Sequence, residues 1–350
     1  MNKITLVIPS YNNLKHIKNA YTSIRKHYPE VNLVLLDDGS NDGTWEWLNS
    51  LLKTDLYLTI YKSEERVGHT ILYDKGIELA KTDIIGILHA DMIVGPNYIE
   101  NLLKHLKPQT VVCATRIEPP LHPEGKEKII RNFGLDFDDL NIEAFEEYTL
   151  EAQNEYKDQT SKGMFAPWIL YKSDFQAIGG HDPGFAPFPY EDSDIFQRWI
   201  LAGYELIQSR DSFVYHLTCR GHRWNEQVGK NDDYFTIVEK KAREYYIKKW
   251  GSWIKNNEYQ YPIIIPVYKK KLILTNPNPQ LEEALSIWFN GGEDIIVEVD
   301  GNTFTQQDFN YIVQLNEIIK DSGEAGQFNL GNLKITINSL QEYQKDLIKL

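Results

Sequence analysis

Residues 84–88 form a run of apolar or small residues that leads directly into His89 and Asp91. A short apolar run of this length predicts a strand that is buried on both faces. Polar residues at its carboxyl end would point out of the sheet, at the edge where open α/β sheets bind ligands. Asp91 is therefore a candidate metal ligand or phosphate-side residue. The alternative is that Asp91 only caps the turn before Gly95.

The chain has 350 residues, enough for one large α/β domain and a smaller one. Its two cysteines, Cys113 and Cys219, cannot form a disulfide framework and fit a reducing compartment. A strand begins within the first few residues, and no apolar run approaches the ~20 residues that span a bilayer. We therefore expect no signal peptide, no transmembrane segment and a cytoplasmic location. The net charge of −13 argues against non-specific nucleic-acid binding over the whole surface, although a local basic site remains open.

Strand and helix patterns alternate along the first part of the chain. Strands are expected over residues 4–8, 31–36, 56–62 and 84–91, and helices over residues 14–27, 44–52 and 70–80. This order is typical of a mostly parallel, Rossmann-like sheet with flanking helices. The predicted fold class is therefore α/β.

The first two strands end in polar residues, with Ser10 after the first and Asp38 after the second. Both should meet Asp91 at one edge of the sheet. No Gly-x-Gly-x-x-Gly fingerprint and no Walker lysine loop follows the first strand. Since a carboxylate is a poor phosphate partner unless a cation intervenes, the pattern indicates base or ribose hydrogen bonds and a divalent metal that bridges the phosphates.

Over roughly residues 4–220 the chain resembles the family 2 glycosyltransferases, which are inverting enzymes with the GT-A fold. Each matching piece is weak alone, but together, in family order, they are specific. The pieces are Val7-Ile8-Pro9-Ser10-Tyr11-Asn12, Asp37-Asp38-Gly39-Ser40, His89-Ala90-Asp91, Ile178-Gly179-Gly180-His181-Asp182-Pro183-Gly184-Phe185, Glu191-Asp192-Ser193-Asp194, Ala202-Gly203-Tyr204 and Val214-Tyr215-His216.

The resemblance implies an inverting, metal-dependent transfer of a sugar from a nucleotide-sugar, with UDP as the carrier, to an acceptor hydroxyl. It implies that Asp91 and His216 hold Mn²⁺ or Mg²⁺, that Asp38 reads the base, and that Asp192 is the general base. It also places Pro9, Ser10, Tyr11 and Ala90 against the donor.

The sequence departs from the family pattern at the metal motif, where His89 stands in place of the usual aspartate. His89 could contact ribose, contact the metal or fill space. Tyr73 and Asp74 occupy positions where the family often has Arg-Asn. Arg66 and Lys75 are then the nearby candidates for neutralising the diphosphate, and either could be an ordinary solvated charge.

In the acceptor half, short strands are expected over residues 110–115 and 214–216. Trp168 is a candidate platform for a sugar or acceptor, and a core position is the alternative. Glu191 and Asp192 begin a strongly periodic helix that ends at Gly203. The helix dipole should keep Asp192 ionised and able to accept a proton. Glu191 is placed beside the substrate, with helix capping as the alternative. The acidic connection over residues 117–160 reads as a charged surface insertion.

Residues 220–271 contain twelve Lys/Arg and six Asp/Glu, with aromatic residues interleaved. This segment could be a solvated helix that packs its aromatic residues on the catalytic domain. It could also dock an anionic acceptor, such as nucleic acid, a lipid phosphate or an anionic glycan. A nucleic-acid acceptor would present a hydroxylated base by flipping.

We expect a catalytic domain over residues 1–258, with a nucleotide-sugar half (1–107) and an acceptor half (108–258). A small α/β module over residues 259–350 would select the acceptor or form an oligomer. The alternative from another class is a non-catalytic nucleotide-sugar-binding protein with a degenerate metal motif, which His89 favours. A nucleotidyltransferase would need a basic glycine-rich loop that is missing.

Overall fold

The computed structural model describes residues 3–218, 224–225, 230–231, 233–275, 278–300, 304–322 and 325–350. Its contacts divide the chain into two compact units. The first comprises residues 1–239, 256–262 and 350, and the second comprises residues 240–255 and 263–349. The division passes through helix α8 (Asp233–Trp250), whereas the sequence pattern places a boundary at residue 258.

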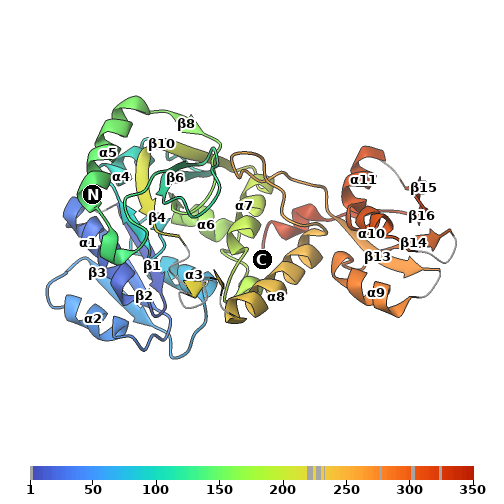
Figure 1. Ribbon diagram of the computed structural model, residues 1–350, viewed down its shortest axis with the longest axis horizontal. Helices are drawn as coiled ribbons and strands as arrows, with labels where there is room; N and C mark the ends of the chain where they lie inside the picture. The colour runs from blue at the N-terminus through green and yellow to red at the C-terminus, as the bar shows by residue number, and fades with distance from the viewer. Residues whose placement is uncertain are drawn as a thin grey trace. The chain divides into compact units, whose positions relative to one another are not determined.

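The first unit contains one large sheet with helices around it (Figure 1). Its strands are β1 (Ile4–Ser10), β2 (Asn32–Asp37), β3 (Leu58–Lys62), β4 (Ile84–Ile87), β5 (Met92–Val94), β6 (Thr110–Glu118), β7 (Lys128–Ile130), β8 (Thr160–Ser161), β9 (Trp168–Tyr171) and β10 (Glu205–His216), with the separate pair β11 (Trp224–Asn225) and β12 (Lys230–Asn231). Its helices are α1 (Leu14–His27), α2 (Thr44–Leu51), α3 (His69–Leu79), α4 (Tyr98–Leu103), α5 (Ile142–Glu155), α6 (Lys172–Ala177), α7 (Glu191–Leu201) and the start of α8, with 3-10 turns η1 (Phe137–Asp139) and η2 (Pro183–Phe185).

The large sheet has the strand order β3-β2-β1-β4-β9-β6-β10-β5. Strands β1 to β4 pair in parallel, and β6 is parallel to β10, while β9 and β5 run antiparallel to their neighbours. The expected α/β class with a mostly parallel sheet is confirmed. The order reverses between β1 and β4, and the carboxyl ends of parallel strands at such a switch point form a crevice.

Apolar side chains explain why the parallel strands lie in the interior. Every residue of β1 is buried, as β-branched and leucine residues of a central strand should be. Helix α3 packs closely on this strand, because Gly76 has no side chain. A Cβ at Gly76 would lie 2.2 Å from Cγ1 of Val7, so this position holds α3 against β1.

Three expected elements differ from the structure. Strand β4 ends at Ile87, so His89 and Asp91 lie in a loop and not at the end of a strand. Strand β10 starts at Glu205 and is much longer than the Val214–His216 strand expected there. Helix α5 is more than a surface insertion, because its Phe145 is fully buried against rings of the sheet.

The second unit has its own five-stranded sheet of order β15-β16-β14-β13-β17. Its elements are β13 (Tyr268–Leu274), α9 (Pro279–Leu285), η3 (Ser286–Trp288), β14 (Glu293–Val299), α10 (Gln306–Val313), α11 (Leu315–Ser322), β15 (Gly326–Leu330), β16 (Leu333–Ile337), β17 (Gln341–Glu342) and η4 (Gln344–Leu347). A core of aliphatic side chains from these strands and helices fills it. The expected small α/β module is confirmed, and its last element is a 3-10 turn.

Helix α7 is held in the first unit by a buried ion pair. Nε of Arg198 donates to Oδ2 of Asp194 at 2.8 Å, and both side chains are fully buried. The remaining guanidinium nitrogens donate to the carbonyl oxygens of Ile178, at 3.0 Å, and Gly180, at 2.5 Å. Asp194 therefore anchors the helix and the preceding turn, because a buried pair of charges must find all its partners inside the protein.

We predict that Arg198→Met lowers the free energy of unfolding by about 3–5 kcal/mol, because it leaves the Asp194 carboxylate buried without its cation. Urea unfolding followed by tryptophan fluorescence measures the change. Lys107→Met, at an exposed lysine, is the matched control and should change stability by less than about 0.5 kcal/mol. A loss below about 1 kcal/mol for Arg198→Met would contradict the anchoring role.

Candidate functional site

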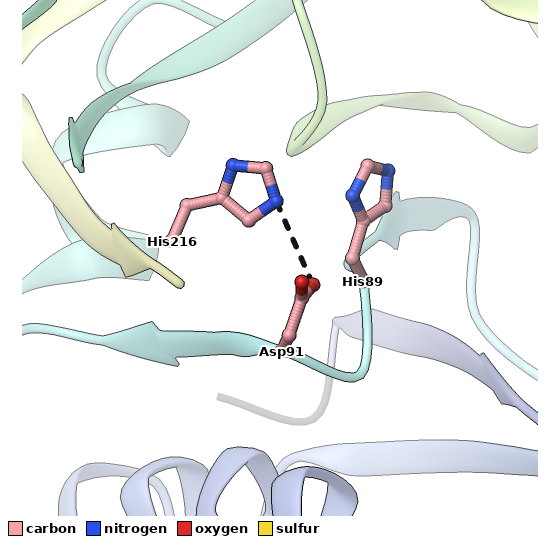
Figure 2. A group of neighbouring side chains, drawn as sticks. All are labelled: His89, Asp91 and His216. Atoms are coloured by element: carbon pink, nitrogen blue, oxygen red, sulfur yellow. Dashed lines mark ion pairs between the residues drawn. The ribbon is translucent and has the colours of Figure 1, made fainter. Parts of the chain in front are cut away.

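The loop after β4 and the end of β10 meet at one edge of the large sheet. The backbone N–H of Leu88 donates to Val7, and that of Leu217 donates to the carbonyl oxygen of Asp91 at 3.1 Å. These bonds fix the loop between β1 and β10. Figure 2 shows the result, with His216 and Asp91 pointing toward one another and His89 beside them.

His89, Asp91 and His216 each offer a ligand atom, and these atoms lie within 4.8 Å of one another. Nε2 of His216 is 3.6 Å from Oδ1 of Asp91, and the two imidazole rings are 5.5 Å apart. No other group of this kind occurs in the described part of the chain. Two imidazoles and one carboxylate suit a transition ion such as Mn²⁺ better than Mg²⁺, which prefers oxygen ligands. The residues present therefore fit a divalent metal.

The charges of the three groups agree with this fit. Burial lowers the pKa of His89 to about 3, so its imidazole is neutral, as a ligand must be. Burial opposes the charge of Asp91, but His216 outweighs it and holds the Asp91 pKa below its usual range. Burial also opposes the charge of His216, yet Asp91 and Glu118 raise its pKa to about 9. A bound cation would replace the proton that His216 shares with Asp91.

Glu118, the last residue of β6, supports His216 from behind and was not among the expected site residues. Its Oε1 lies 3.0 Å from Nδ1 of His216, which leaves Nε2 facing Asp91. Arg116 and Lys128 contact the same carboxylate at 2.8 Å and 3.0 Å. A carboxylate on the second ring nitrogen orients a metal-binding histidine. The only signal in the sequence was an acidic residue shortly after an apolar run. The expected strand ended at Thr115, three residues before Glu118.

Asp38 anchors the loop that precedes α3. Its carboxylate accepts from the backbone N–H groups of Val67, at 2.7 Å, and Gly68, at 2.9 Å, and it is 3% exposed. Gly68 has φ 91° and its missing Cβ would lie 2.2 Å from Pro187, so only glycine lets these loops meet. Burial raises the pKa of Asp38, and the loop N–H groups counter this.

The guanidinium group of Arg66 lies in a cage of aromatic rings. It is 4.0 Å from the ring centre of Tyr11, 4.7 Å from that of Tyr234 and 5.3 Å from that of Phe188. Beside this cage, Ser10 is buried, and its hydroxyl has no hydrogen-bond partner among the described residues. Pro9 pairs with Leu36 inside the sheet. These residues gather at the carboxyl ends of β1 and β2.

Two expected site residues point elsewhere. Lys75 forms an ion pair with Glu78 on α3 at 2.9 Å, and its ammonium lies over the ring of Tyr61. Trp168 is 1% exposed and packs edge-on against Trp199. Trp168 is therefore a core residue, and no face of its ring is open to a sugar. Ala90 is buried between His89 and Asp91.

The start of α7 brings two adjacent carboxylates to the site. Oε1 of Glu191 lies 2.7 Å from Nε2 of His69, a partner that the sequence did not indicate. Burial opposes the charge of Glu191, but His69 lowers its pKa to about 2. Burial, followed by the charge of Glu191, raises the pKa of Asp192 to about 6. The helix dipole was expected to keep Asp192 ionised, and burial together with the charge of Glu191 acts against the ionised form.

Two rings of α3, Tyr73 and His69, lie close enough to the site carboxylates for their pKa values to be shifted. Burial raises the pKa of Tyr73 well above its usual range, and Glu191, Asp91 and Asp192 raise it further. Burial lowers the pKa of His69, but Glu191, Asp192 and Asp38 raise it overall. Glu191 and Asp192 at the start of α7 therefore act on both rings of α3, while Asp91 acts on Tyr73 and Asp38 acts on His69.

The basic segment expected over residues 220–271 lies partly outside the described residues, which omit 219–223, 226–229 and 232. In α8, Lys240, Lys241 and Lys248 are exposed, and Lys249 is partly exposed. None of the described helices is long and apolar enough to cross a membrane.

Comparisons with known proteins agree with these features. Residues 5–176 match the model of Glycosyl transferase family 2. Glycosyltransferase GlyG of Streptococcus pneumoniae is 30% identical over 105 residues, 30% of this chain and 35% of that protein. An uncharacterized glycosyltransferase of Mycoplasma genitalium is 31% identical over 113 residues, 31% of this chain and 38% of that protein. The chain thus spans little more than a third of each relative.

A more distant likeness is to the crystal structure of GalNAc-T7 with UDP, GalNAc and Mn²⁺. The TM-score is 0.49 at 19% identity, and the match covers 62% of this chain and 44% of that chain. A likeness of this size says nothing about a shared ligand.

We predict that Mn²⁺ raises the thermal midpoint of the wild-type protein and leaves that of Asp91→Asn unchanged. An ion that binds only the folded form stabilises it by about 2.7 kcal/mol at a hundred times its Kd. Differential scanning fluorimetry with and without Mn²⁺ measures this increment. Asp83→Asn, at an exposed aspartate, should keep the full increment.

His216→Gln and His89→Gln should each reduce the same increment, because each removes one ligand atom from the group. A full increment in His89→Gln would exclude His89 from the metal site and leave ribose contact or space filling as its role. A full increment in Asp91→Asn would exclude the site itself.

Proposed function

Residues 5–176 are a family 2 glycosyltransferase domain, and from that premise we propose that the protein is an inverting glycosyltransferase. It would move a sugar from a nucleotide-sugar, with UDP as the carrier, to a hydroxyl of a glycan acceptor. The observation that carries this proposal is the meeting of two kinds of group at one sheet edge. One is the His89–Asp91–His216 ligand set, and the other is the Glu191–Asp192 carboxylate pair.

Asp192 is the proposed general base. Its pKa of about 6 leaves it mostly ionised at neutral pH and still basic enough to take a proton from the acceptor hydroxyl. As the proton moves to Asp192, the acceptor oxygen bonds to the anomeric carbon and the bond to the diphosphate oxygen breaks. Glu191 is held by His69 as a stable anion, so it positions and tunes Asp192 without taking the proton itself.

His89, Asp91 and His216 would hold the metal, and Mn²⁺ suits this donor set. The bound ion would supply Lewis-acid stabilisation of the leaving diphosphate. Arg66 is the better candidate for a second positive charge near the phosphates, because Lys75 is already paired with Glu78. Ser10, Tyr11 and Asp38 would line the base and ribose side, with Pro9 and Ala90 shaping the floor.

The competing proposal of a non-catalytic nucleotide-sugar-binding protein was based on His89 in the metal motif. A neutral imidazole next to Asp91 can serve as a ligand, so this substitution gives little support to a degenerate site.

We predict that Asp192→Asn still binds UDP and Mn²⁺ but transfers sugar about 10²–10⁴-fold more slowly, because the amide cannot accept the proton. The assay measures UDP released from UDP-glucose, UDP-galactose and UDP-N-acetylglucosamine, with GDP-mannose for comparison. Asp83→Asn is the control and should retain full turnover. Wild-type turnover in Asp192→Asn would refute the base assignment.

The pH profile tests the same assignment independently. Since Asp192 must be ionised to act, kcat/KM should fall about tenfold per pH unit below pH 6 and reach a plateau above about pH 7. Glu191→Gln removes the neighbouring negative charge and should move the acidic limb to lower pH. An unchanged limb in Glu191→Gln would contradict the influence of Glu191 on the base.

A further inference from the structure

A cavity of about 340 Å³ opens beside His216 in the first unit. Its volume is within the range of small-molecule pockets. Its walls include Arg116, Glu118, Glu127, Phe165, His216 and Thr218. We propose that this cavity is the acceptor subsite and that it takes an uncharged, polyhydroxylated sugar ring. The inference rests on the proposed transferase function and names its acceptor class.

Two buried polar atoms in the cavity wall point to a hydroxyl-bearing ligand. Oε2 of Glu127 and Oγ1 of Thr218 have no hydrogen-bond partner among the described residues. The residues are 4% and 2% exposed. A buried polar atom left unpaired costs stability, so such atoms usually await a partner. Sugar hydroxyls can donate to the carboxylate and either donate to or accept from the threonine.

The backbone holds Thr218 in an unusual conformation at this wall. Its φ is 58°, in the left-handed region that a β-branched residue rarely adopts. Strain of this kind persists only where neighbouring contacts impose it, and it concentrates at ligand sites. Leu217, the residue before it, is bonded to the Asp91 loop. The same connection therefore sets the Thr218 hydroxyl and the metal-binding loop.

The charges of the cavity favour an uncharged ligand. Glu118, Glu124 and Glu127 line it, together with Arg116, Lys128 and the imidazole of His216. These three basic groups are already engaged. Arg116 contacts Glu118 and Glu127, Lys128 contacts Glu118, and His216 contacts Glu118 and Asp91. Among the described residues of this lining, every Lys and Arg already has a carboxylate partner. The described wall therefore offers hydroxyl-binding atoms and no free cation for an anionic acceptor.

The sheet order places this cavity on the acceptor side of the metal group. Asp38 and Ser10 lie at the ends of β2 and β1, whereas the cavity lies at the ends of β6 and β10, beyond β4 and β9. His216 belongs to both the cavity wall and the metal group. A donor extended from β2 to the metal would then meet an acceptor entering from β6. Phe165, whose ring has Arg116 at 4.6 Å, offers an aromatic surface to a sugar ring.

Glu127→Gln and Thr218→Val test the proposal, since each keeps the shape of the side chain and changes an atom without a hydrogen-bond partner among the described residues. Glu127→Gln also neutralises the carboxylate that faces Arg116, so Thr218→Val is the cleaner variant. The exposed Glu147→Gln on α5 is the matched control. The probes are methyl glucoside, methyl galactoside and methyl N-acetylglucosaminide, with methyl glucuronide as the charged comparison. The acceptor KM should rise about tenfold or more in both variants, the expected effect of one lost hydrogen bond to a charged or buried group. Hydrolysis of the UDP-sugar without acceptor should remain at the wild-type rate.

Saturation-transfer NMR of the same glycosides, with UDP and Mn²⁺ present, gives a readout that needs no turnover. One outcome separates the two proposals. If the wild-type protein binds a glycoside but turns over no UDP-sugar, and Glu127→Gln abolishes that binding, the cavity is a sugar site and the transferase proposal is wrong. Unchanged glycoside binding and KM in both variants would overturn the cavity assignment. A loss of UDP-sugar hydrolysis in these variants would also overturn it, because the cavity would then hold the donor sugar. A preference for methyl glucuronide over the uncharged glycosides would overturn it as well.

Discussion

The charge of Asp91, held inside the protein, is the constraint on which the site depends. Burial opposes that charge, and His216 compensates for it across 3.6 Å. His216 in turn contacts Glu118, and Glu118 forms ion pairs with Arg116 and Lys128. The row of alternating charges runs from the loop after β4 to β7, and a bound divalent ion would take the place of the proton as the positive charge beside Asp91.

At the start of α7, two neighbouring acidic residues have pKa values that are shifted in opposite directions. Burial opposes ionisation of both Glu191 and Asp192. The contact with His69 lowers the pKa of Glu191 to about 2, and the resulting anion helps to raise that of Asp192 to about 6. Environments that push two carboxyl pKa values apart are how proteins assign separate roles to chemically similar groups. The buried Arg198–Asp194 pair keeps this helix in place.

Residues at the ends of apolar runs were the easiest to predict. Asp91 and His216 follow hydrophobic stretches whose period is readable locally, and parallel strands bring their ends to one edge. Glu118 was missed because the apolar signal fades at Thr115, while the strand continues to Glu118 through pairing with β10 and β7. Pairing with distant strands extends an element beyond its local pattern.

The local sequence does not predict which aromatic side chains are buried in the core and which face a cavity. Trp168 and Phe165 are three positions apart, and nothing in their immediate sequence separates a core ring from an open one. Trp168 is covered by Trp199 of α7, whereas Phe165 faces the cavity beside His216.

Short-range periodicity and the order of motifs were enough to predict the α/β alternation, the polar ends of the strands and the glycosyltransferase family of residues 5–176. Long-range contacts in the folded chain bring His89 beside Asp91 and His216, pair His69 with Glu191, and place Glu127 and Thr218 in the wall of a cavity. Burial and charge pairing depend on residues far apart along the chain, and these residues come into contact only when the sheet forms.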